Sequence, residues 1–261
     1  MKKSSTILLS LLIGSINFSI VNAQVISGSA PGAGVPSEND PYANFFQKWT
    51  PMMQKLFQEV KNNQDYIEYN IGPDVGSAYV TDSFIPGKVY YDDEHLGDVY
   101  YRYNAYNNEI ELKKTNLPEE KEIALIKDEK ITLKAKDVQL KFSNFYTSKN
   151  SYESGYLNLI YTGNNYTVYE RIYITYSEGK PAQNSMVNPI PSKFTNYVNY
   201  FIQTDSEDRI KEIPTKKNKF ISMFDESNSF QIEEYIKNEN LNLKNKIDII
   251  KIINKIEFYN S

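Results

Sequence analysis

The chain has 261 residues, 29 of them basic and 33 acidic, with a formal net charge of −4 at pH 7 and no cysteine. The acidic balance argues against binding of nucleic acid or of anionic membranes, because both require a positively charged surface. The absence of thiols excludes disulfides, cysteine nucleophiles and zinc–cysteine sites, so a hydrophobic core must hold the fold together.

Residues 1–23 have the features of an export signal. Two lysines precede an apolar run over 7–20, and Val21-Asn22-Ala23 supplies small residues for signal peptidase. The run is too short and too broken for a membrane span of ~20 residues. A lipoprotein signal would need a cysteine at the cleavage point. We expect the mature chain to begin at Gln24, to work in the periplasm or outside the cell, and to start with a flexible leader over 24–41.

A helix is the first element expected after the leader. Thr50 followed by Pro51 is typical of a helix start. Apolar side chains then recur at helical spacing; they are Met53, Leu56, Phe57 and Val60. We expect this N-terminal helix to pack against the main body of the protein.

Over residues 65–203, apolar side chains recur at every second position, which is typical of half-buried strands. Val99, Tyr101 and Tyr103 alternate with polar residues, and the longest such run covers 166–176. Turn residues separate the runs, for example Asp92-Asp93 and Asn107-Asn108. Short strands joined by tight turns predict antiparallel hairpins, with one face of the sheet buried and the other in water. Residues 182–194 are expected to form a loop.

After Pro214 the pattern becomes helical and predicts three helices. Their expected inward side chains are Phe220, Ile221 and Phe224 in the first, Phe230, Tyr235 and Ile236 in the second, and Ile249, Ile250, Ile253 and Ile256 in the third. The prediction is an α+β fold: a curved antiparallel sheet or open barrel with an N-terminal helix and three C-terminal helices. We expect one domain over 42–261, with 214–261 as a lid on the apolar face of the sheet.

The strand–turn–strand segment 101–112 carries the candidate site. A two-residue Asn107-Asn108 turn would place Arg102 opposite Glu109 or Glu111. Two interpretations stay open: an exposed ion pair that sets the hairpin register, or a polar ligand site. The ligand site would consist of Arg102, Asn104, Glu109 and Glu111. The two glutamates occupy a spacing found in every amphipathic strand, so they do not indicate a glycosidase pair.

His95 is the only histidine and follows three acids, Asp92, Asp93 and Glu94. A general base or a calcium ligand set would use these residue types. The acids lack the spacing and glycine of a calcium loop, so we interpret the segment as a solvated turn. The chain also has no G-x-S-x-G elbow and no phosphate-binding glycine loop. We therefore predict no catalytic residue, metal or cofactor.

Three stretches resemble a group of uncharacterised exported proteins of the Bacteroidota. They are Gly76-Ser77-Ala78-Tyr79-Val80 with Phe84, Gly87 and Val89; the hairpin from Arg102 to Glu111; and the C-terminal set Phe230, Ile232, Tyr235, Ile236, Lys237, Asn240, Leu241, Asp248 and Ile249. The segment around Trp49 departs from the pattern. The resemblance implies a secreted, β-rich domain with a helical end, and it implies no activity.

These features predict a non-enzymatic protein of the periplasm or cell envelope. It would bind a protein partner or a small ligand on the face of the sheet. The alternative is a secreted hydrolase that uses carboxylates, with glycans as substrates. A shallow concave face lined with Tyr and Phe would favour binding, and two convergent carboxylates in a deep cleft would favour the enzyme.

Overall fold

The computed structural model describes residues 51–58, 75–184, 186–224 and 228–260. All of them belong to one compact unit, Pro41–Ser261. The predicted signal peptide, the leader, Trp49 and Val60 lie outside the described residues. No described helix combines the length and the apolar character that crossing a membrane would need.

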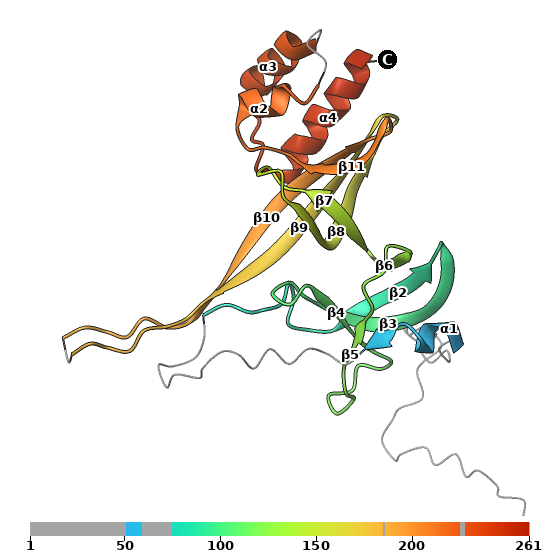
Figure 1. The fold of residues 1–261 in the computed structure, drawn as a ribbon, viewed down its shortest axis with the longest axis vertical. Helices are drawn as coiled ribbons and strands as arrows, with labels where there is room; N and C mark the ends of the chain where they lie inside the picture. The colour runs from blue at the N-terminus through green and yellow to red at the C-terminus, as the bar shows by residue number, and fades with distance from the viewer. Residues whose placement is uncertain (1–50, 59–74, 185, 225–227, 261) are drawn as a thin grey trace, which may run out of the picture. The chain divides into compact units, whose positions relative to one another are not determined.

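A single mixed sheet makes up most of the described chain, and three helices follow it (Figure 1). Its open part runs in the order β1 (Phe57–Gln58), β5 (Ile123–Leu125), β4 (Glu109–Lys113), β3 (Glu94–Asn104), β2 (Ile85–Tyr91), β6 (Ile131–Ala135). The order continues with β7 (Val138–Tyr146), β11 (Glu207–Glu212), β10 (Lys193–Thr204), β9 (Tyr166–Ser177) and β8 (Tyr152–Thr162). The helices are α1 (Pro51–Gln54), α2 (Lys217–Ile221), α3 (Ser229–Asn238) and α4 (Lys246–Asn260).

Five of the strands close into a ring, because β8 pairs with β7 as well as with β9. The named strands pair in antiparallel fashion except for β7 and β11, which meet in parallel at Tyr146 and Lys211. The expected α+β fold with a curved sheet is confirmed, and it combines a closed ring with an open sheet. The prediction of a mostly antiparallel sheet is confirmed, and the one parallel contact between named strands joins β7 to β11.

Each strand of the ring contributes one side chain to a small core. These side chains are Phe145, Leu157, Tyr169, Phe201 and Ile210. The rings of Phe145 and Phe201 lie 4.6 Å apart between centroids. Because side chains alternate along a strand, the neighbours of these residues point away from this core.

The C-terminal helices cover the opposite face of β9 and β10. Val168, Tyr200 and Ile202 from these strands share one apolar cluster with α2, α3 and α4. The helical residues of this cluster include Phe220, Ile221, Ile232, Ile236, Ile249, Ile252, Ile253 and Ile256. The sheet and the helices thus bury their apolar surfaces against each other, which short helices cannot do alone.

One predicted inward side chain of the helices points outward. Phe230 is 69% exposed, and Ile232 occupies the buried position in α3 instead. In α4, Ile252 is buried and the predicted Ile250 is half-buried. The helices begin close to where they were expected, and the predicted Ile236 is buried, but the buried side of α3 includes Ile232 in place of Phe230.

A carboxylate on α4 holds the turn between β8 and β9. Glu257 accepts hydrogen bonds from the backbone N–H groups of Asn165 at 3.0 Å and Tyr166 at 3.1 Å, and from the Tyr161 hydroxyl at 2.8 Å. Burial raises the pKa of this carboxyl, but the hydrogen bonds from Asn165, Tyr161, Asn164 and Tyr166 outweigh it, so the pKa lies below its ordinary value. The ionised form of Glu257 is therefore built into the fold.

Two local predictions are wrong. The N-terminal helix ends at Gln54, and Phe57 lies in β1, paired with Leu125. The hairpin between β3 and β4 has a four-residue turn over 105–108 rather than a two-residue turn. Asn108 alone of the two asparagines takes positive φ, at +55°, and the Asn104 side chain accepts a hydrogen bond from the Asn107 N–H, which tightens the turn.

Candidate functional site

The four predicted site residues lie on one face of the β3–β4 hairpin. Arg102 is directly opposite Glu111, and Asn104 is opposite Glu109. The other face of the same hairpin carries Tyr101, Tyr103, Ile110 and Leu112, all in the core of the open sheet. The alternation that predicted the two faces is therefore observed.

Glu111 is the centre of a polar network. Arg102 donates to Glu111 Oε2 through Nε at 3.0 Å and Nη2 at 2.5 Å, and Asn104 Nδ2 donates to Oε1 at 3.2 Å. The Tyr79 hydroxyl also bonds Glu111, and burial together with this carboxylate raises the pKa of Tyr79 to about 12. The carboxylate thus has donors from three side chains on two separate segments.

Aromatic rings hold Arg102 from outside the hairpin. The guanidinium carbon lies 3.8 Å from the centroid of the Tyr79 ring and 4.5 Å from that of Phe84. Cation–π contacts of this kind favour a desolvated arginine. Tyr79 and Phe84 were not predicted as partners of Arg102. Both belong to the stretch before the hairpin on which the family resemblance rests.

The ion pair is not exposed to water as one interpretation assumed. Arg102 is 16% exposed and Glu111 1% exposed at their side chains, and every residue of β4 is buried. The segment 75–84 covers this face, with Tyr79 paired to Asn104 by a backbone bridge. The network supports a structural role for Arg102, Asn104 and Glu111, because their hydrogen-bonding groups already face one another.

His95 lies within β3 and not in a loop. Its Nε2 is 3.2 Å from an oxygen of Asp98, and its ring lies 5.3 Å from the Tyr90 ring. The two-residue turn before it uses Asp92 and Asp93, both with positive φ. In the described part of the chain, no group of three or more His, Cys, Asp or Glu side chains is arranged to hold a metal ion.

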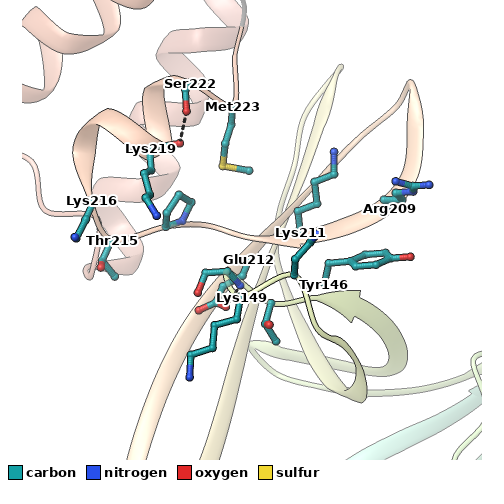
Figure 2. A pocket seen from close by; sticks show the side chains of 14 residues that line it. Tyr146, Lys149, Arg209, Lys211, Glu212, Thr215, Lys216, Lys219, Ser222 and Met223 are labelled. Atoms are coloured by element: carbon teal, nitrogen blue, oxygen red, sulfur yellow. Dashed lines mark hydrogen bonds between the residues drawn. The ribbon is translucent and has the colours of Figure 1, made fainter.

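A cationic cleft of about 710 Å³ lies between β11, the β7–β8 turn and α2 (Figure 2). Five of its side chains are basic: Lys149, Arg209, Lys211, Lys216 and Lys219. The acid among the residues that line it, Glu212, accepts hydrogen bonds from the Ser148 N–H at 2.6 Å and from Asn199 Nδ2 at 2.9 Å. This cleft was not predicted, although four of its five basic residues lie close together within 209–219; the fold adds Lys149 from a distant segment.

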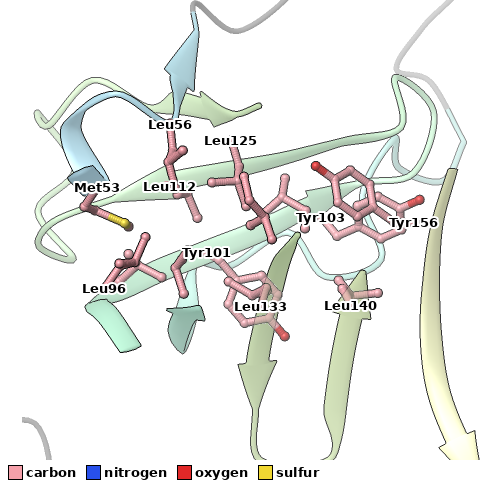
Figure 3. Packing of buried hydrophobic residues seen from close by; sticks show 14 of the residues in the cluster. Met53, Leu56, Leu96, Tyr101, Tyr103, Leu112, Leu125, Leu133, Leu140 and Tyr156 are labelled. Atoms are coloured by element: carbon pink, nitrogen blue, oxygen red, sulfur yellow. The ribbon is translucent and has the colours of Figure 1, made fainter. Parts of the chain in front are cut away.

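A second hollow, of about 300 Å³, is lined mostly by apolar side chains; we call it the tyrosine pocket. It lies where β2 and β3 face β7, β8 and β9, and its apolar lining includes Tyr101, Tyr103, Tyr156, Leu140 and Ile172. Figure 3 shows Tyr103 and Tyr156 against each other, with ring centroids 5.7 Å apart, beside Leu140. Burial raises the pKa of both tyrosines well above the ordinary value, so both stay neutral.

Polar groups gather at one side of the tyrosine pocket. Lys246 and Glu170 form an ion pair at 3.5 Å, and Asn158 Nδ2 donates to Glu170 at 3.2 Å. Asp137 also lines the pocket. The Tyr156 hydroxyl is buried and has no hydrogen-bond partner among the residues that the structure describes. An apolar body with a few convergent polar groups is the usual composition of a small-molecule site.

Comparison of the chain with known protein families, with curated proteins and with solved structures finds no match.

Proposed function

We propose that the protein is an exported, non-enzymatic binding module that holds a small, largely apolar molecule in the tyrosine pocket. The observation that carries the proposal is a hollow of about 300 Å³ with three tyrosine rings in its lining and a charged pair at one side. This volume lies at the lower end of the range of ligand pockets. The ligand would place its apolar part against the rings and one polar group near Glu170 and Lys246.

The pocket is tested with a neutral apolar fluorescent probe, N-phenyl-1-naphthylamine. We expect saturable binding with enhanced fluorescence, because the probe leaves water for an apolar site. Ile172→Phe adds volume inside the pocket and should weaken binding on the order of tenfold, since a filled pocket cannot admit the ring. Ile190→Phe makes the same change at a residue that is 59% exposed and should leave binding unchanged. Equal effects of the two variants would contradict the proposal.

Export is tested separately from binding. We propose cleavage after Ala23, on the basis of the two N-terminal lysines, the apolar run and the small residues before the expected cut. Mass spectrometry of the secreted or periplasmic protein should give a mature chain that begins at Gln24. A full-length chain retained in the cytoplasm would refute the proposed location and would leave the pocket proposal standing.

The hydrolase alternative makes a different prediction for the same pocket. Asp137 and Glu170 are the carboxylates in its lining, and Glu170 is already engaged by Lys246 and Asn158. A carboxylate-dependent hydrolase would lose turnover in Asp137→Asn and Glu170→Gln. We expect instead that the wild-type protein releases no reducing sugar from neutral glycans, and that both variants bind the probe.

A further inference from the structure

The cationic cleft concentrates positive charge in a chain whose net charge is −4. Lys211 pairs with Glu207 at 2.5 Å. Among the described residues, Lys149, Lys216 and Lys219 form no ion pair. The guanidinium carbon of Arg209 lies 5.7 Å from the centroid of the Tyr146 ring, and Arg209 interacts electrostatically with Glu207. Like charges gathered around one hollow repel one another, and an anionic ligand would relieve this repulsion.

A second hollow of about 530 Å³ adjoins the cleft, and Tyr146 and Arg209 line both. The rings of Tyr146 and Tyr152 lie 5.2 Å apart, and Tyr152 is 62% exposed. The lining there also includes two amides, two acids and a lysine: Asn144, Gln203, Glu129, Asp208 and Lys141. The two hollows thus adjoin at Tyr146 and Arg209, and we call them together the groove: one half is cationic, and the other holds aromatic rings, amides and charges of both signs.

The second half of the groove restricts the class of ligand. The exposed Tyr152 ring offers a flat apolar face to the C–H side of a sugar. The Asp208 carboxylate can accept hydrogen bonds from sugar hydroxyls, whereas the amide oxygens of Asn144 and Gln203 already accept hydrogen bonds from Ser154 and Tyr169. A nucleic acid carries a phosphate on every unit, whereas this half of the groove balances Glu129 and Asp208 against Lys141 and Arg209 and has no surplus of positive charge for a phosphate. A chain in which charged units accompany neutral, hydroxyl-bearing units suits both halves.

We infer that this groove binds an oligosaccharide that carries carboxylate or sulfate groups. Its anionic units pair with Lys149, Lys216 and Lys219 in the cleft, and its neutral units lie against Tyr152. The site is separate from the tyrosine pocket, so neither proposal depends on the other.

The test uses calorimetric titration of the full chain with a hyaluronan hexasaccharide, in which glucuronate and neutral N-acetylglucosamine alternate. We expect saturable binding that weakens between about 50 mM and about 500 mM sodium chloride, because exposed charges are screened by salt. The neutral N-acetylglucosamine hexamer should bind at least about tenfold more weakly, because it forms no ion pair.

Charge-matched variants assign the binding to the cleft. The triple variant Lys149→Gln, Lys216→Gln, Lys219→Gln should lose affinity on the order of tenfold, because three modest ion-pair contributions are removed together. Its control removes three exposed lysines from other surfaces, Lys121→Gln, Lys136→Gln and Lys251→Gln, and should bind as the wild type does. All six side chains are exposed, so both variants should fold.

A second pair of variants tests the aromatic half. Tyr152→Ala should weaken binding of the hyaluronan hexasaccharide, and Tyr197→Ala, which removes another exposed tyrosine ring outside the groove, should not. Three results would overturn the inference: no binding of the hexasaccharide, equal losses in the two lysine triples, or tighter binding of a thymidine hexanucleotide than of the hexasaccharide. Probe binding in the tyrosine pocket should stay unchanged in every groove variant.

Discussion

At the scale of single residues, the structure shows that the Arg102–Glu111 ion pair is buried and not exposed. Opposite charges across a hairpin are common on exposed faces and contribute little there. In this protein the carboxylate is 1% exposed, and the guanidinium is enclosed by Glu111, Tyr79 and Phe84. Removal of one partner therefore leaves a buried charge unpaired, which is far more costly than the loss of a surface contact.

Arg102→Ala should lower the free energy of unfolding by about 3–5 kcal/mol, because Glu111 would remain buried without its cation. Urea unfolding at neutral pH measures this loss. Lys130→Ala is the control, since Lys130 and Asp92 form an ion pair at 2.9 Å with both side chains more than half exposed. We expect its effect to be small. Equal destabilisation by the two variants would show that the buried network adds nothing beyond a surface pair.

Glu257 should make the stability of the fold depend on acidity. Its pKa in the folded protein lies below the ordinary value of 4.5, so the folded state binds this proton less readily than the unfolded state does. The stabilisation is complete above pH 4.5 and is lost as the pH falls through the folded-state pKa. Glu257→Gln should be less stable than the wild type at neutral pH and should lose less stability on acidification.

Denaturant unfolding at neutral and acidic pH measures this difference. Glu234→Gln serves as the control, because Glu234 is an exposed glutamate on α3. If the stability of Glu257→Gln changed with pH as that of the wild type does, the hydrogen bonds that hold the β8–β9 turn would not depend on the charge of residue 257.

At the scale of elements, the C-terminal helices complete the core of β9 and β10. Deletion of 228–261 would expose Val168, Tyr200 and Ile202, which α3 and α4 cover. We expect the truncated protein to aggregate and to bind an apolar dye, because a large apolar face would meet water. Size-exclusion chromatography measures the outcome, with Phe230→Ser as a control that should stay monomeric because Phe230 is already exposed. A truncated protein that stays soluble and unfolds cooperatively would contradict this prediction.

Elements with a strong period were predictable from the sequence. The run over 166–176 became β9, and the switch at Pro214 marked the start of the helical part. The strand β11 was missed because its sequence EDRIKE is mostly polar and buries only Ile210. Its pairing with β7 and β10, a tertiary effect, makes it a strand.

The sites were less predictable than the elements. Spacing within one hairpin was enough to place Arg102 opposite Glu111. It could not show that the segment 75–84 covers that face, since this contact joins residues far apart in sequence. The cationic cleft draws side chains from two separate segments, 146–150 and 209–223, and the tyrosine pocket draws side chains from six. A pattern within one segment cannot show that distant segments come together in the fold.

At the scale of the whole molecule, neighbouring residues of single strands belong to different cores. On β8, Tyr156 belongs to the core of the open sheet and Leu157 to the core of the ring. On β10, Phe201 faces the ring while Tyr200 and Ile202 face the helices. Displacement of one strand would therefore disturb two cores together.

We accordingly expect one cooperative unfolding transition. Leu133→Ala in the open-sheet core and Phe201→Ala in the ring core should each lower the free energy of that same transition, by about 2–5 kcal/mol. Far-UV and near-UV circular dichroism should report coincident curves for both variants. Two separated transitions, one moved by each substitution, would show that the open sheet and the ring unfold independently.

The parallel contact that closes the ring also bears on the order of events during folding. The hairpins β6–β7, β7–β8 and β9–β10 join strands that are close in sequence, whereas Tyr146 and Lys211 must meet across a long intervening chain. Distant pairings form slowly, because the entropy of loop closure is lost before the contact is gained. We expect ring closure to follow hairpin formation and to limit the folding rate. Until β11 reaches β7, Phe145, Leu157 and Phe201 remain accessible to other chains, so the yield of refolding should fall as protein concentration rises.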